Sequence, residues 1–490
     1  MAGCRPFKIP MLKTISTSSP LGVSAEQASQ LPRQNGAARI VLRRAFLLVC
    51  CAAMLLWVAI YNGYPTVTPD SGNYIRSGAF HVALFPFRAP GYAVFTRWTS
   101  LATSAWYTII AQAIIVVHVL RETFVHLIGR EHVDRSLLAV VCALSALTSL
   151  PWFVSQLMPD IFTGVLFLCV FLLGFADEFH VARKSVLALI MMLSVAAHTS
   201  LFPIAAVYVV VVVAAKLSGR KTESLASTRS VAAWLLVPII LAGLWTATQN
   251  RKMGLGFRLS PSKNAFLLGR LFGDGLAPDF LRANCPTRSF ISCRYLSNLP
   301  RDEEAFLFGH PLLQALNGHD DEISAIVHGT IAAYPRRFLL SSLQQTLFQL
   351  VTLRTGGNMR LHPASDGNFY DLRFSLPGDI PAFGKARQLT DRMFPLTNAI
   401  APVNTAIFWI SFVACALFAR TGRFAPINKV FVMSIVFLVL NAAVCGAFAG
   451  VYDRYQSRVA WLIPLCLSVY ICSFLKARRR EFVFQDATCR

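Results

Sequence analysis

Long apolar stretches recur along this chain, about ten in all, and short polar segments separate most of them. Hydrophobic residues make up 55% of the 490 positions and charged residues only 14%, proportions that exclude a water-soluble enzyme. A helix suits a bilayer because it satisfies its own backbone hydrogen bonds. The sequence therefore predicts an all-α polytopic membrane protein with about ten transmembrane helices.

The formal net charge of +22 indicates how these helices are oriented. Lys and Arg gather in alternate loops and at the chain ends, which is the pattern of the positive-inside rule. The basic residues are thus explained by the lipid bilayer, and we expect no nucleic-acid partner. We expect a multi-pass protein of the cell's inner (plasma) membrane with both termini in the cytoplasm.

The apolar stretches also divide the chain into parts with different expected environments. We expect both ends to be cytoplasmic tails, the first of them disordered because it lacks an apolar period. The one large polar segment, between helices 7 and 8, is expected to form a folded extracytoplasmic domain. The parts are a tail at 1–44, seven helices within 45–248 that include an outer loop at 64–99, the extracytoplasmic domain at 249–392, three helices within 393–475 and a tail at 476–490.

Two cysteines, Cys285 and Cys293, lie in the large polar segment and not in an apolar stretch. Only a short run containing Pro and Ser separates them. If the segment faces an oxidising compartment, this pair predicts a disulfide that closes a small loop. A zinc site is the alternative, but no CxxC motif and no nearby histidine complete a ligand set.

Apolar residues at helical spacing predict a helix over 322–350 in the same segment. Pro335 lies within that pattern and is expected to kink or break the helix, because proline removes a backbone donor. Asp320, Asp321 and Glu322 come first and favour the start of the helix through its dipole. The alternative is that they bind a divalent cation, the one cofactor that the sequence leaves open.

The outer loop after the first apolar stretch holds Asp70 at the expected membrane boundary. One interpretation is that Asp70 caps a short helix, because a Pro-Asp-Ser-Gly run favours a turn or a helix start. A functional interpretation is compatible with this one, since a carboxylate near Arg76 and Arg88 at this depth costs desolvation energy. The two most distinctive runs of the loop are Thr68-Pro69-Asp70-Ser71-Gly72-Asn73-Tyr74 and Arg88-Ala89-Pro90-Gly91-Tyr92.

These two runs resemble motifs of the GT-C superfamily of membrane glycosyltransferases, in the branch that contains protein O-mannosyltransferases and the lipid A aminoarabinose transferase. Members of that branch carry a catalytic Asp soon after the first span, followed by an Arg-Pro-Pro-Gly-Tyr-like run. This chain departs from the pattern at Ala89, where the branch has a proline, and has no Asp-x-Asp near Asp70. The run 453–455, Asp-Arg-Tyr, looks like an Arg-Tyr pair near the last outer loop of some members. The resemblance implies a GT-C-like fold and a sugar donor linked to a polyprenyl phosphate.

The implied reaction requires one base and a site for a phosphate. A phosphate leaving group departs as a stable anion and needs no general acid, so one carboxylate that deprotonates the acceptor hydroxyl suffices. We predict that Asp70 is this base. Guanidinium groups match phosphate oxygens in geometry and charge. The residues predicted to bind substrate or phosphate are Arg88, Tyr74, Tyr92, Arg454 and Arg458.

Three further residues at predicted span ends are candidates for a second acid or an acceptor site: Asp160, His198 and Asp453. Each has a structural alternative. Asp160 follows a proline and suits a helix N-cap, His198 suits a hydrogen-bonded turn, and Asp453 suits an ordinary surface turn. For Arg88 the alternative is a side chain that reaches the lipid headgroups.

The sequence therefore predicts a glycosyltransferase of the extracytoplasmic membrane face, with a polyprenyl-phosphate-linked sugar as donor and a glycan, lipid or protein as acceptor. An enzyme of the O-antigen ligase or polymerase kind is a near alternative, because it uses a similar donor. A lipid or solute transporter or flippase, with these ionisable residues as proton or substrate sites, is another. The third alternative is a non-catalytic assembly factor whose large outer domain binds partners.

Overall fold

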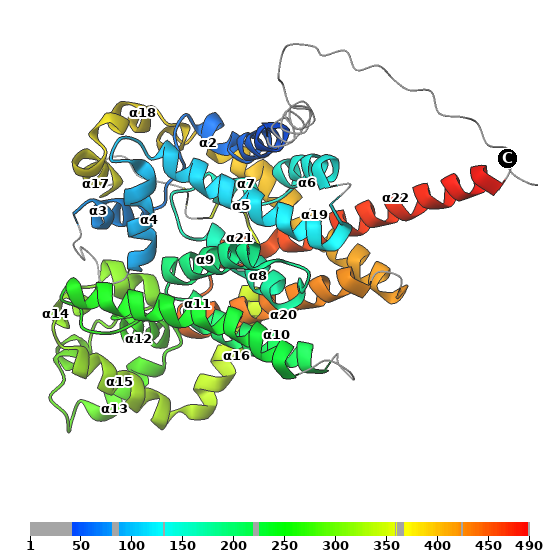
Figure 1. The fold of residues 1–490 in the computed structure, drawn as a ribbon. Helices are drawn as coiled ribbons and strands as arrows, with labels where there is room; N and C mark the ends of the chain where they lie inside the picture. The colour runs from blue at the N-terminus through cyan, green and yellow to red at the C-terminus, as the bar shows by residue number, and fades with distance from the viewer. Residues whose placement is uncertain are drawn as a thin grey trace, which may run out of the picture. The chain divides into compact units, whose positions relative to one another are not determined.

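The computed structural model describes residues 42–80, 88–130, 133–218, 225–357, 359, 367–422 and 425–488 of the chain (Figure 1). The regular elements in these ranges are helices, and the only β-pairing there is one isolated bridge between Thr66 and Gln156. The predicted all-α class is therefore confirmed for the described part of the chain. Most of the predicted N-terminal tail, and the loop residues 81–87, lie outside it.

Six helices in the described ranges are long and apolar enough to cross a membrane, which supports a membrane protein. The prediction of about ten spans stays a prediction, because several other apolar helices are shorter. The first expected span, for example, is a helix over 42–55 followed, after Leu56, by α2 (Trp57–Asn62). The six are α5 (Trp106–Ile128), α10 (Leu201–Ser218), the Arg229–Lys252 part of α11 (Leu225–Lys252), α19 (Phe394–Arg420), α20 (Ala425–Phe448) and the Asp453–Arg478 stretch formed by α21 (Asp453–Ala460) and α22 (Leu462–Thr488).

The short helix α8 (Ile161–Phe175) lies at the centre of the helical bundle. Every one of its residues except Phe175 is buried, and it packs against α5, α10, α20 and α21 as well as α9 (Val181–Ala197). A helix that is apolar on all sides is stable where other helices surround it completely. Because α8 begins at Ile161, it carries the preceding residue, Asp160, into the interior.

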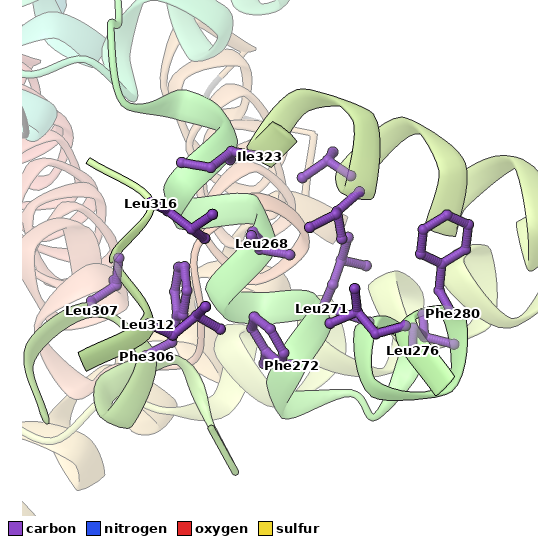
Figure 2. Close-up of a cluster of buried hydrophobic side chains, with 14 residues drawn as sticks. Leu268, Leu271, Phe272, Leu276, Phe280, Phe306, Leu307, Leu312, Leu316 and Ile323 are labelled. Atoms are coloured by element: carbon purple, nitrogen blue, oxygen red, sulfur yellow. The ribbon is translucent and has the colours of Figure 1, made fainter. Parts of the chain in front are cut away.

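The segment between α11 and α19 contains a hydrophobic core of its own. Figure 2 shows this core, in which Leu268 and Phe272 of α12 (Lys263–Gly273) lie close to Phe306 and Leu312. The helices of the whole segment include α12, α13 (Leu276–Asn284), α14 (Pro311–Ala315), α15 (Asp320–Ala333), α16 (Pro335–Val351), α17 (Gly367–Ser375) and α18 (Ile380–Gly384).

Two predictions for this segment are confirmed. Cys285 and Cys293 form a disulfide, with their Cα atoms 5.5 Å apart. The predicted long helix is broken as expected: α15 ends at Ala333 and α16 begins at Pro335. Proline is tolerated there because the first position of a helix needs no intrahelical N–H bond.

The loop that carries Asp70 is held by residues distant in sequence. Helix α17 packs against α3 (Ser71–Phe80), and Asn368 of α17 accepts a hydrogen bond of 2.6 Å from Gly72 N. The same amide donates to Thr68 O at 3.0 Å. A Cβ at Gly72 would lie 2.7 Å from Asp371 Oδ2, so this close approach requires glycine. Asn368 therefore fixes the turn on both sides of Asp70.

Candidate functional site

Asp70 lies between two arginines in the turn before α3. Arg88 donates to Asp70 Oδ1, and Arg454 Nη1 lies 3.0 Å from Asp70 Oδ2. The backbone N–H groups of Thr68 and Asp70 are hydrogen-bonded by the hydroxyls of Ser71 and Thr68 instead. The hydroxyls thus stabilise the turn, which leaves both carboxylate oxygens of Asp70 for the arginines.

The two arginines reach Asp70 from separate parts of the chain. Arg88 lies just before α4 (Pro90–Ser100), whose start is fixed by proline at its first position. Gly91 brings α4 so close to the backbone of Ala196 that a side chain at this position would overlap with it. Arg454 belongs to the first turn of α21. Asp70, the predicted base, is therefore in direct contact with Arg88 and Arg454, two of the residues predicted to bind phosphate.

The charges of this cluster do not cancel. Two guanidinium groups and one carboxylate leave a net charge of +1. Burial by itself would raise the pKa of Asp70, but Arg454 and Arg88 outweigh it and hold the pKa below its ordinary value of 3.8. Within the described residues, Nε of Arg88 and Nε of Arg454 have no hydrogen-bond partner. The cluster therefore has an ionised carboxylate together with donors and positive charge that suit an anion.

A second Asp–Arg pair lies one helical turn away. Arg458 Nη1 is 3.0 Å from Asp160 Oδ1, and both side chains are almost completely buried. Arg458 Nη2 also donates to Asn441 at 2.9 Å. Asp160 occupies the N-cap position of α8, but its side chain makes no capping hydrogen bond, so the predicted capping role is wrong. Pairing with Arg458 explains its burial better.

His198 lies in the turn between α9 and α10, as the hydrogen-bonded alternative predicted. Its Nδ1 is 2.8 Å from Ser200 Oγ and accepts from Ser200 N at 3.2 Å. Burial, and to a smaller extent the repulsion from Arg458, lowers the pKa of His198 to about 3. His198 is therefore neutral near pH 7.

Tyr74 and Tyr92 stack edge to face beside this cluster, with ring centroids 5.2 Å apart. Tyr92 donates its hydroxyl proton to Gln112 Oε1 at 2.6 Å, which ties α4 to α5. Burial raises the pKa of both phenols, so both are neutral. In the present geometry Tyr92 contributes packing and a helix–helix bond.

Asp453 faces a pocket that sequence reasoning did not predict. The pocket measures about 210 Å³ and its wall includes Arg354, which follows the end of α16. Arg354 also lines a groove of about 490 Å³ along α19. No sequence signal pointed to Arg354, because a single basic residue after a helix in a polar segment is common. The other pocket residues are Thr355, Gly356, Gly357, Met359, Gln388, Asp391, Met393, Phe394 and Thr397.

Glu303 is a second residue that sequence reasoning missed. It is only 8% exposed and packs so closely on Gly450 that a side chain there would overlap its carboxylate. Burial raises the pKa of Glu303 to about 8, against the lowering effect of a hydrogen bond with Tyr452. Glu303 thus contacts the turn that leads directly into Asp453 and Arg454.

Within the described residues, no group of three or more His, Cys, Asp or Glu side chains is arranged to hold a metal ion. A scan against known protein families and searches of curated proteins and of solved structures found no match.

Proposed function

We propose that this protein transfers a glycosyl unit from a polyprenyl-phosphate-linked donor to a hydroxyl-bearing acceptor at the membrane face where Asp70 lies. The observation that carries the proposal is the pairing of one carboxylate, Asp70, with two guanidinium groups, those of Arg88 and Arg454. The reaction needs one base and a cationic site for the phosphate, and this cluster supplies both.

In the proposed step Asp70 takes the proton of the acceptor hydroxyl. The acceptor oxygen forms a bond to the anomeric carbon of the sugar, and the bond from that carbon to the phosphate oxygen breaks. The electron pair leaves with the polyprenyl phosphate, whose negative charge Arg88 and Arg454 stabilise. No second acid is needed, because the phosphate leaves as a stable anion.

The arginines also regulate the strength of the base. Without a donor, both guanidinium groups lower the pKa of Asp70 and make it a weak base. A donor phosphate shares those guanidinium groups and so reduces their hold on the carboxylate. Binding of the donor therefore raises the basicity of Asp70 when the acceptor must lose its proton.

The surface near Asp453 offers a route for a lipid-linked substrate. The groove along α19 is lined mainly by apolar residues, including Ala401, Pro402 and Trp409, and Arg354 is also part of its lining. Arg354 also lines the pocket at Asp453, the residue before Arg454. An isoprenoid chain in the groove would bring its phosphate towards this pocket. This arrangement supports a lipid-borne substrate over a freely soluble one.

Gene disruption followed by reintroduction tests the proposal. The envelope glycans and glycolipids of the disrupted cells are expected to lose the mass of one sugar residue. Wild-type protein restores this mass, and Asp70→Asn does not, although it reaches the membrane in the same amount. Asp320→Asn is the matched control, because Asp320 forms an exposed ion pair with Arg258. Full restoration by Asp70→Asn, or no change of glycans on disruption, contradicts the proposal.

A further inference from the structure

Helix α16 has its polar and apolar faces reversed relative to a helix on a water-soluble domain. Its large apolar side chains point away from the protein, with exposed fractions from 51% for Phe348 to 69% for Leu339. Most of its polar side chains after the first turn are instead buried or half-buried, with Gln344 the exposed exception. The exposed apolar residues are Leu339, Leu340, Leu343, Leu347, Phe348 and Val351.

The inward polar residues of α16 form specific hydrogen bonds. Ser341 donates to Asp274 Oδ2 at 2.9 Å. Near the other end of the helix, Gln349 accepts from Tyr452 N at 2.9 Å and donates to Tyr452 O at 3.0 Å. A water-facing helix would expose these groups and bury the leucines, so the medium outside α16 is apolar.

The neighbours of α16 indicate which apolar medium this is. It packs along α20, one of the six helices that are able to cross a membrane. Gly446 of α20 permits an unusually close approach, since a Cβ there would lie 2.7 Å from Gln345 O. The exposed leucines therefore lie on a helix that packs against one able to cross a membrane.

The chain beyond α16 reaches into the bundle and then returns. Asn404 Nδ2 donates to Thr355 Oγ1 at 3.0 Å, and Asn404 lies ten residues after the start of α19. The two residues after Thr355 lie nearer the start of that helix, since a Cβ at Gly356 would be 2.9 Å from Thr397 Cγ2 and one at Gly357 would be 2.6 Å from Asp453 Cβ. The next described helix, α17, packs against α3 beside Asp70. Because the chain returns to the Asp70 side, α16 does not cross the membrane.

We propose that α16 is a re-entrant helix embedded in the leaflet on the Asp70 side, with its leucine face against lipid acyl chains. Its 17 residues extend over about 26 Å, less than the roughly 30 Å of a bilayer core. Arg336 and Arg337, exposed at its first turn, suit the headgroup region. One helix of the segment expected to be extracytoplasmic thus belongs to the bilayer. This inference does not depend on the proposed enzymatic function.

Photocrosslinking in bilayers tests this assignment. Full-length protein carrying p-benzoylphenylalanine in place of Leu343 or Leu347 is reconstituted in phospholipid nanodiscs and irradiated, and adducts are identified by mass spectrometry. Ala325, exposed on α15, is the control position. We expect phospholipid adducts at 343 and 347 and none at 325. Absence of lipid adducts at both leucine positions, or crosslinks between two copies of the chain there, overturns the proposal.

A second measurement does not depend on the photoreactive residue. Leu343→Lys is expected to lower the Tm in nanodiscs, because a lysine there must face acyl chains. Ala325→Lys is expected to leave the Tm unchanged. Equal Tm values for Leu343→Lys and wild type would mean that the face contacts water, which also overturns the assignment.

Discussion

Arg454 and Arg458, one turn apart on α21, each contact an aspartate, but the two contacts differ in charge balance and in burial. Arg458 and Asp160 form a buried pair of one positive and one negative charge, with side chains 0% and 1% exposed. Arg454 shares Asp70 with Arg88, and these three side chains are 11–15% exposed. The first contact is neutral and closed, whereas the second has excess positive charge and access to solvent.

This difference shows how one helix combines a structural contact with a candidate reactive one. Residues four positions apart lie on the same face of a helix, so Arg454 and Arg458 point in the same general direction. The two arginines differ in how deeply their side chains are buried. We therefore expect changes in the buried pair to affect folding and changes around Asp70 to affect function.

The largest effect is expected for Asp160→Ala. This change leaves Arg458 buried without a counter-charge, which typically costs about 3–5 kcal/mol. Thermal unfolding of the detergent-solubilised protein measures the loss. Asp320→Ala, which breaks an exposed pair with Arg258, should cost about 0–1 kcal/mol. Similar losses for the two variants would show that the Asp160 pair is not structural.

Removing the amide that holds the Asp70 turn should have a smaller effect on stability. Asn368→Ala removes hydrogen bonds to Gly72 and Thr68 in a buried position, at a cost of about 1–3 kcal/mol. Thr390→Ala is the control, since its hydroxyl makes one exposed local bond. Unchanged stability of Asn368→Ala would mean that α17 does not fix the turn.

Replacing each arginine by lysine separates the two contacts directly. Arg458→Lys loses the fork that spans Asp160 and Asn441, and its unfolding free energy should fall by about 1–2 kcal/mol. Arg454→Lys should stay within about 0.5 kcal/mol of wild type, because its position is partly exposed. In nanodiscs Arg454→Lys should instead bind polyprenyl phosphate about tenfold more weakly. The reverse assignment of the two effects would contradict the comparison.

The pH dependence of stability gives the smallest effect and extends the comparison to Glu303. The pKa of Glu303 is raised from its ordinary value of 4.5 to about 8, so the folded state holds its proton more tightly. Its contribution to stability is complete below about pH 4.5 and is lost as the pH rises towards 8. Glu303→Gln should therefore remove part of the decrease in Tm over that range. Parallel Tm curves for both proteins would contradict this.

The contribution of Asp70 to stability changes with pH in the opposite direction to that of Glu303. Its pKa is lowered, so its contribution to stability is present above its ordinary pKa of 3.8 and is lost as the pH falls through the folded-state value. Asp70→Asn should therefore reduce the loss of stability in acid. No difference from wild type below pH 4 would show that the arginines do not stabilise the ionised carboxylate.

Local sequence patterns predicted a substantial part of this architecture. The break at Pro335 and the disulfide between Cys285 and Cys293 follow from residue chemistry over short distances. The proximity of Asp70 to Arg88 follows from their positions in one loop. Arg454 was predicted to bind phosphate from its likeness to a family motif, but its direct contact with Asp70 follows from packing between distant parts of the chain.

The remaining features depend on contacts between distant residues and could not be predicted. Asp160 follows a proline before a helix, and the local pattern of an N-cap gave no indication of Arg458. The pKa of Glu303 is raised by burial, which depends on packing against residues distant in sequence such as Gly450. For α16 the helical period was evident, but periodicity does not reveal whether its apolar face meets protein or lipid.

The most direct test of the central claim is the conversion of lipid-linked sugars by purified protein. Protein in nanodiscs is given a mixed pool of polyprenyl-phosphate sugars with crude membrane acceptors, and release of free polyprenyl phosphate is followed by mass spectrometry. We predict release by wild type, and a rate about 10²–10⁴-fold lower for Asp70→Asn with its fold intact. Equal rates for the two proteins would contradict the assignment of Asp70 as the base.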